Sequence, residues 1–328
     1  MDWEKVDWHV LERLRSTFLD GTAGREEYWR GEGDLAAYDL TFAQRIGWKW
    51  DWVLADLSRR GWRPPEGEVL DWGCGSGIAG RTFLRQFQEG RAKALVLHDR
   101  SVLAMDYAKR RAIGLFPGID VRCRNASDAS APTFIVSHVL GELAPHQVDA
   151  LVAQLRQATA VLWVEPGAYE ISRALIAIRE RLRGEFQIVA PCTHHAVCGL
   201  LAPQNQRHWC HHFARTPTEA FMDANWGRFA RMAGIDLRSL PLSFLVLDKR
   251  GALPLPAGAV RVIGRPRVHK DAARLFGCDA FGVRERRLAK RAFPQEYRLC
   301  KRGDLKTLQD WTLDGDEIIA VREVLPQQ

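Results

Sequence analysis

The spacing of apolar and polar positions divides the chain at a proline-rich break near residue 64. Before the break, residues 1–62 carry apolar side chains three or four positions apart, as at Leu11, Leu14 and Phe18. This spacing predicts an N-terminal helical segment, because such residues fall on one face of a helix. Pro64 follows directly and marks where the helical pattern stops.

After the break, short apolar runs alternate with stretches of helical length. Neighbouring parallel strands need crossover connections, so this order predicts an α/β fold with a parallel, doubly wound sheet. The first five runs are Glu68–Asp71, Ala94–His98, Ile119–Cys123, Thr133–Ser137 and Ala160–Val164. A helix over Ile171–Arg183 and two further strands over Phe186–Ala190 and Leu242–Asp248 are expected to follow.

Beyond residue 250, Gly and Pro punctuate short apolar runs such as Val260–Ile263 and Glu317–Val321. This pattern predicts a small β-rich C-terminal unit. The expected organisation is an N-terminal helical segment (1–62), a cofactor-binding domain (63–250) with a Cys/His-rich insertion (191–241), and the C-terminal unit (251–328).

Composition indicates the cellular environment that we expect for the protein. The chain has 328 residues, of which 46% are hydrophobic, and its sequence contains no apolar run of membrane-spanning length. Its start has neither the basic nor the apolar region of a secretion signal. The seven cysteines are an odd number and are unevenly placed, which favours a reducing compartment over a disulfide framework. We therefore expect a soluble cytoplasmic protein.

Positive charge is concentrated in one stretch. The whole chain carries a net charge of +7, whereas residues 250–302 contain fourteen Lys or Arg and four Asp or Glu, a net charge of 14 − 4 = +10. The remainder of the chain is slightly acidic. A basic stretch of this kind favours an anionic partner.

The strongest chemical signal follows the first apolar run. That run ends in Asp71, and Gly73, Gly75 and Gly77 follow at alternate positions before a predicted helix. Glycines allow a sharp turn close to a ligand, and a helix N-terminus offers free N–H groups. The next strand ends at Asp99, where a carboxylate can accept hydrogen bonds from ribose hydroxyls. Together these residues predict an S-adenosylmethionine site, with Asp71 near the ammonium group.

Two other loops overlap the same residues. Gly75–Gly80 also satisfies the dinucleotide fingerprint, and Gly75–Thr82 is one residue from a phosphate loop. The dinucleotide motif does not explain Asp71, and the phosphate loop would have Arg81 where it requires lysine. The S-adenosylmethionine interpretation accounts for more of the residues.

The sequence assigns no catalytic residue. Segment 137–143 lacks the Asn/Asp-Pro-Pro-aromatic motif of many base N-methyltransferases, and it lacks the cysteine nucleophile of cytosine C5 chemistry. His138 and Glu142 follow the fourth run, and Glu165 ends the fifth, where open α/β folds place ligands. A purely structural role explains these three residues equally well.

A second candidate site lies after the sixth run. Cys192, Cys198 and Cys210 fall within nineteen residues, and five histidines lie within residues 192–212. Thiolates of this kind bind zinc or, in fours, an iron–sulfur cluster. The spacing differs from the paired cysteines of common zinc modules, so a fourth ligand must come from a nearby histidine, Cys278 or Cys300.

Several of these segments, in this order, resemble the methyltransferase-like proteins of small ribosomal subunit assembly, a family known from mitochondria with bacterial relatives. The resemblance covers most of the chain from about residue 35. The segments that carry it are Val69–Gly77, Val139–Leu143, Val164–Gly167, Ala190–His194 with Cys198, His208–Phe213 and Ser243–Leu247.

The resemblance implies an S-adenosylmethionine-type domain with a four-cysteine [4Fe–4S] site that acts on the small ribosomal subunit through its rRNA. Cys192, Cys198 and Cys210 match the first three ligands of the family. Cys278, rather than Cys300, matches the fourth, because Arg265-Pro-Arg267 and Leu275-Phe-Gly precede it. The expected role of the cluster is structural, and zinc is the alternative metal.

These features support an rRNA-directed methyltransferase, or an assembly factor derived from one. The competing hypothesis is a non-catalytic RNA-binding protein that retains the cofactor loop only as scaffold.

Overall fold

The computed structural model describes residues 3–20, 27–87, 91–125, 131–251 and 253–324. Its contacts divide the chain into two units. The sheet unit comprises Met1–Ser58, Arg63–Glu165 and Ala214–Leu240, and the barrel unit comprises Arg59–Trp62, Pro166–Phe213 and Pro241–Gln328. This division differs from the expected boundaries near residues 62 and 250. The expected insertion is split, because its part up to Phe213 belongs to one unit with the C-terminal strands and Ala214–Leu240 belongs to the sheet unit.

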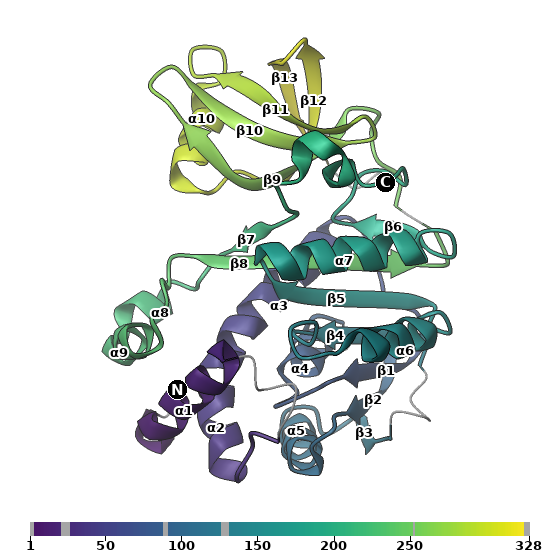
Figure 1. The fold of residues 1–328 in the computed structure, drawn as a ribbon, viewed down its shortest axis with the longest axis vertical. Helices are drawn as coiled ribbons and strands as arrows, with labels where there is room; N and C mark the ends of the chain where they lie inside the picture. The colour runs from purple at the N-terminus through teal and green to yellow at the C-terminus, as the bar shows by residue number, and fades with distance from the viewer. Residues whose placement is uncertain (1–2, 21–26, 88–90, 126–130, 252, 325–328) are drawn as a thin grey trace. The chain divides into compact units, whose positions relative to one another are not determined.

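The sheet unit is built on five parallel strands in the order β3-β2-β1-β4-β5. Both faces of β1, β2, β4 and β5 are largely buried, as expected for parallel strands covered by helices. The strands are β1 (Gly67–Trp72), β2 (Ala92–His98), β3 (Asp120–Cys123), β4 (Thr133–Ser137) and β5 (Ala160–Pro166). The five predicted strands are thereby confirmed, and Figure 1 shows them side by side.

Helices connect these strands and precede them. Helix α4 (Ile78–Phe87) packs on β1, β2 and β4, and α5 (Val102–Leu115) packs on β2 and β3. Helix α6 (Pro145–Leu155) joins β4 to β5. The remaining helices in the described part of this unit are η1 (Trp3–Lys5), α1 (Trp8–Leu19), α2 (Glu32–Leu40), α3 (Phe42–Arg59), α8 (Glu219–Met222) and α9 (Ala224–Ala233).

The N-terminal helices have their own apolar cores. Leu14 and Leu35 pack with Tyr107 of α5, and Leu11 packs with Trp226 and Phe229 of α9. The predicted N-terminal helical segment is therefore part of the sheet unit as far as Ser58. Its aromatic residues also reach the cavity described below.

The barrel unit begins with α7 (Tyr169–Leu182) and β6 (Gln187–Ala190), which runs antiparallel to β8 (Leu240–Asp248). After β6 the chain forms η3 (Gly199–Leu201), η4 (Pro203–Asn205) and β7 (His212–Ala214), which pairs with β8, and it returns to β8 after α8 and α9. The two strands predicted over Phe186–Ala190 and Leu242–Asp248 are both present, as β6 and β8. They are antiparallel to each other.

The C-terminal strands close into a five-stranded barrel in the order β10-β11-β13-β12-β9. Strands β11 and β13 are parallel, and a helix lies between the third and fourth strands of the barrel. This is the topology of the oligonucleotide/oligosaccharide-binding (OB) fold. The elements are β9 (Ala259–Val268), β10 (Ala272–Asp279), β11 (Gly282–Ala289), α10 (Pro294–Arg302), β12 (Leu308–Asp314) and β13 (Glu317–Glu323).

The barrel interior is apolar and tightly filled. Val260, Ala273, Leu288 and Trp311 are buried together inside it. A Cβ atom on Gly277 would lie 2.7 Å from the Trp311 ring, so only glycine fits there. The β-rich C-terminal unit is confirmed and is a closed barrel. In the described residues, no helix is both long and apolar enough to cross a membrane.

Candidate cofactor pocket and cysteine site

The loop between β1 and α4 requires its glycines. Gly73, Gly75 and Gly77 all have positive φ, of 70°, 51° and 78°. A Cβ on Gly73 would lie 2.7 Å from Val139 Cγ1, and one on Gly77 would lie 2.8 Å from Ala108 Cβ. A Cβ on Gly75 would meet nothing within 4 Å. The first and third glycines are therefore fixed by packing, and the second faces open space.

Asp99 fastens this loop to the end of β2. Its Oδ2 accepts a hydrogen bond from the Gly75 amide (2.8 Å), and its Oδ1 accepts one from the Ser101 amide (2.9 Å). Burial raises the pKa of Asp99, while the two backbone hydrogen bonds lower it. The structure places Asp99 directly after β2, as the sequence predicts, and its carboxylate contacts the Gly75 amide. Its contact with a ribose stays a prediction.

Asp71 lies beneath the loop and is fully buried. Its Oδ2 accepts a hydrogen bond from the Gly80 amide at 2.8 Å, and burial raises its pKa to about 7. Its other oxygen has no hydrogen-bond partner among the described residues. Asp71 does not line the cavity. Its hydrogen bond with the Gly80 amide instead connects the end of β1 to α4 beneath the loop.

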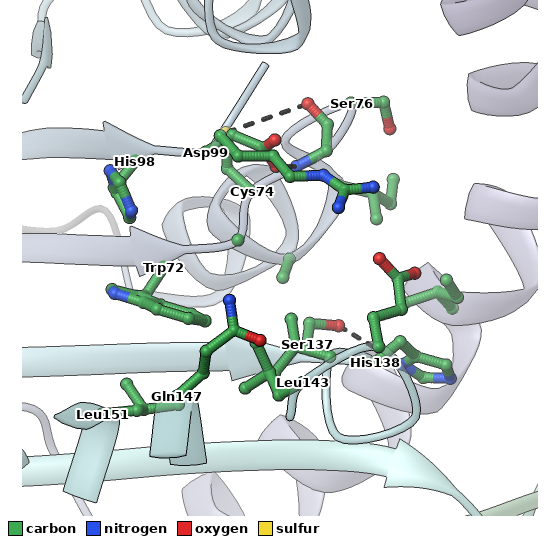
Figure 2. Close-up of a pocket in the computed structure, with 18 of the residues that line it drawn as sticks. Trp72, Cys74, Ser76, His98, Asp99, Ser137, His138, Leu143, Gln147 and Leu151 are labelled. Carbon is green, nitrogen blue, oxygen red and sulfur yellow. Dashed lines mark hydrogen bonds between the residues drawn. The ribbon is translucent and has the colours of Figure 1, made fainter. Parts of the chain in front are cut away.

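A cavity of about 440 Å³ lies over the loop, within the range of small-molecule sites. Figure 2 shows Trp72, Asp99 and Gln147 around it. Aromatic side chains from the N-terminal part of the chain form another section of the wall, namely Phe18, Tyr28, Trp29 and Tyr38. The cavity thus combines apolar surfaces with a few polar groups near the glycine loop.

His138 lies on the cavity wall directly after β4 and has an unusual backbone. It is the one non-glycine residue with positive φ in the described chain, at 56°. Such a conformation costs about 1–3 kcal/mol and points to a functional constraint. Glu165 stabilises the turn, because its Oε1 accepts hydrogen bonds from the amides of Val139 (3.0 Å) and Leu140 (3.2 Å).

A buried lysine contacts this histidine. Lys49 Nζ lies 3.1 Å from His138 Nε2, and burial lowers the pKa of Lys49 to about 7. Burial and the charge of Lys49 also lower the pKa of His138. Of the two groups, Lys49 therefore has the pKa near neutrality, and a proton taken up by the pair would reside on Lys49. Glu142, which lines the same cavity, has a pKa raised by burial to about 7.

The sequence interpretation missed Lys49 and the aromatic wall. Lys49 is one polar residue in a Trp-rich helix, and nothing in its spacing marks it as buried. The sequence leaves open whether His138, Glu142 and Glu165 have a ligand-binding or a structural role. The structure places His138 and Glu142 on the cavity wall and Glu165 behind the turn that follows β4.

The four cysteines matched to the family all lie in the barrel unit. Cys192 follows β6, Cys198 precedes η3, Cys210 precedes β7 and Cys278 lies on β10. Burial raises the pKa of Cys278, and the charges of the other three thiolates raise it further, so the four are within electrostatic range of one another. Cys300 instead packs in the barrel interior.

Polar groups surround the thiols. Arg179, which is 2% exposed, donates a hydrogen bond from Nε to Cys192 Sγ at 3.4 Å. His194 Nε2 lies 3.8 Å from Cys278 Sγ, and His212 Nε2 lies 3.7 Å from Cys210 Sγ. Among the residues that the structure describes, no three His, Cys, Asp or Glu side chains converge closely enough for one metal ion.

One family model matches most of the chain. The family model described as "Mitochondrial small ribosomal subunit Rsm22" matches residues 61–304. No curated protein sequence matches the chain at a significant level.

Among solved structures, the chain is similar to magnesium protoporphyrin IX methyltransferase from Synechocystis PCC 6803 with bound SAH, at 14% identity and a TM-score of 0.40, covering 73% of this chain and 99% of that chain. The methyltransferase domain of bacterial CtHen1 is 12% identical, with a TM-score of 0.38 and coverage of 63% and 98%. The fold assignment rests on the strand order and glycine loop described above.

Proposed function

Because the chain belongs to the Rsm22 family of the mitochondrial small ribosomal subunit, we propose that it acts on the small subunit as an S-adenosylmethionine-dependent, rRNA-directed methyltransferase. The observation that carries the proposal is the cavity, in which the glycine loop, Asp99 and the strained His138 turn meet. The family description supports the ribosomal partner.

The residues present fit the cofactor. Gly75 leaves open space where any other residue would place a Cβ, and the carboxylate of Asp99 can accept hydrogen bonds from a ribose. Trp72 and Tyr28 offer apolar surface for an adenine ring. When bound, S-adenosylmethionine supplies an electrophilic methyl group.

The chain itself would manage the proton that the acceptor atom loses. His138 lines the cavity and contacts Lys49, so the pair can accept this proton and hold it away from the cavity. The aromatic wall would exclude water from the same space. Glu165 keeps His138 in place through the amides of the next two residues.

We further propose that Cys192, Cys198, Cys210 and Cys278 hold a [4Fe–4S] cluster, with zinc as the alternative. A four-iron cluster is wider than a single ion, so its ligands stand further apart than the ligands of zinc. Three of the cysteines belong to the insertion and one to β10. The cluster would therefore fasten the insertion to the barrel, since metal-binding free energy holds distant segments together.

Calorimetry with S-adenosylmethionine and transfer of a labelled methyl group to small-subunit RNA test the first proposal. We expect binding and transfer for the wild type, and binding with much reduced transfer for Lys49→Met. Binding without transfer to any assembly form of the subunit would support a non-catalytic assembly factor. That alternative is favoured by the absence of a base-gripping motif in segment 137–143.

Anaerobic purification followed by iron, sulfide and zinc analysis tests the second. Four irons per chain are expected. Stoichiometric zinc without sulfide would instead show that the four cysteines bind zinc. The predicted cytoplasmic location stays a prediction, and the family description adds the mitochondrion as the other compartment in which small subunits assemble. Fractionation of the source cells distinguishes them.

A further inference from the structure

One face of the barrel carries a row of arginines across three adjacent strands. Arg274 of β10 is paired with Arg267 of β9 on one side and with Arg287 of β11 on the other. Ala273 and Leu275 point into the barrel core, so Arg274 points outward. Adjacent strands lie about 4.8 Å apart, so the row spans about 10 Å.

The row places three positive charges side by side. Like charges directly opposite each other destabilise a sheet. Arg267 forms an ion pair with Glu285, and Arg287 forms ion pairs with Asp271 and Glu317. In the described part of the chain, the central Arg274 has no carboxylate partner. The row is thus incompletely neutralised at its centre.

An aromatic platform lies beside the row on the same face. Phe276 is two residues beyond Arg274 on β10. Its ring centroid lies 4.4 Å from that of His208, and the guanidinium of Arg267 lies 5.8 Å from it. Both rings are partly exposed. Flat rings beside cations are what sequence-tolerant binders of single strands use, since every base has a face that stacks.

We propose that this face, consisting of Arg267, Arg274, Arg287, Phe276 and His208, binds single-stranded RNA. In the OB fold the second and third strands and the loop before the second strand form the oligonucleotide surface. Here these elements are β10, β11 and the loop over residues 269–271. The arginines would contact phosphates and the rings would stack on bases.

The inference rests on the proposed function only for the origin of the RNA. A rigid A-form duplex keeps its bases paired and cannot stack them on the Phe276 ring. Single-stranded rRNA segments offer both phosphates and free base faces. The cofactor cavity belongs to the other unit, so RNA binding at the barrel and cofactor binding can be measured separately.

The test uses the full chain and a fluorescent twelve-nucleotide oligouridylate, followed by anisotropy at several salt concentrations. The double variant Arg267→Gln/Arg274→Gln should bind at least tenfold more weakly. The salt slope should fall by about 0.7 for each phosphate that the variant no longer neutralises. Phe276→Leu should weaken binding by about fivefold or more at unchanged salt slope. Arg298→Gln, on exposed α10, is the matched control and should bind like the wild type.

Arg274→Lys keeps the charge and should recover most of the affinity that Arg274→Gln removes, which separates phosphate binding from misfolding. Equal affinities for the double variant and the Arg298→Gln control would overturn the proposal. So would binding of a duplex of equal length as tightly as oligouridylate. The affinity of the same variants for S-adenosylmethionine, measured by calorimetry, should equal that of the wild type. A wild type that binds RNA but no S-adenosylmethionine would count against the methyltransferase proposal alone.

Discussion

Glu165→Gln tests whether the carboxyl group behind the cavity is held in an environment that opposes its charge. Glu165 is fully buried, and burial raises its pKa from 4.5 to about 7. In the folded state it therefore keeps a proton that the unfolded chain loses between pH 4.5 and pH 7. Its contribution to the free energy of unfolding is complete below pH 4.5 and is lost as the pH rises through about 7.

The size of this loss follows from the shift. At 1.36 kcal/mol for each pKa unit, a rise of about 2.5 units corresponds to roughly 3 kcal/mol. Glutamine keeps an oxygen for the amides of Val139 and Leu140 but does not titrate. Its new NH₂ group takes the place of Oε2, which has no partner among the described residues, at a cost of about 1–3 kcal/mol at every pH.

Urea unfolding followed by tryptophan fluorescence between pH 4.5 and pH 8 measures the effect. The difference in unfolding free energy between variant and wild type should shift by roughly 3 kcal/mol in favour of the variant over this range. Glu12→Gln, at a side chain that is 61% exposed, should give a curve parallel to the wild type. A Glu165→Gln curve that is also parallel would refute the reasoning.

Three further experiments separate the roles of individual residues. Gly75→Ala should lower the unfolding free energy by about 1–2 kcal/mol through backbone strain. Gly73→Ala should lower it by about 1–3 kcal/mol more, because its Cβ also collides with Val139. Thermal unfolding of the two variants measures this order of stability. Asp99→Asn should weaken S-adenosylmethionine binding in calorimetry by about tenfold or more, the effect of losing a charged hydrogen bond. Cys278→Ser should abolish iron binding in anaerobic preparations while Cys300→Ser retains four irons per chain, and equal iron content in both variants would contradict the assigned ligand set.

Local patterns predicted the strands and the glycine loop, because both follow from short stretches of sequence. The runs ending at Asp71 and Asp99 became neighbouring parallel strands, and the glycines between them adopted positive φ. The contact between Lys49 and His138 could not be predicted in this way. These residues are 89 positions apart, and only the packing of α3 behind β4 brings them together.

The arrangement of arginines on the barrel could not be predicted from local patterns either. Its basic character is visible in the composition of residues 250–302, but the row of arginines is not. Arg267, Arg274 and Arg287 become neighbours only through the register of three strands, and a shift of one residue would turn Arg274 into the core. Composition therefore predicted an anionic partner, and strand pairing identified the surface.

The question of enzyme or scaffold depends on the groups around His138. A cofactor loop kept only for the fold would need its glycines and the bracing carboxylate of Asp71, which contribute to packing. It would not need a buried lysine against a histidine with positive φ, since both features cost stability. Replacing Lys49 by methionine should therefore stabilise the sheet unit, whether the chain is a scaffold or an enzyme. In an enzyme the same change should also reduce methyl transfer.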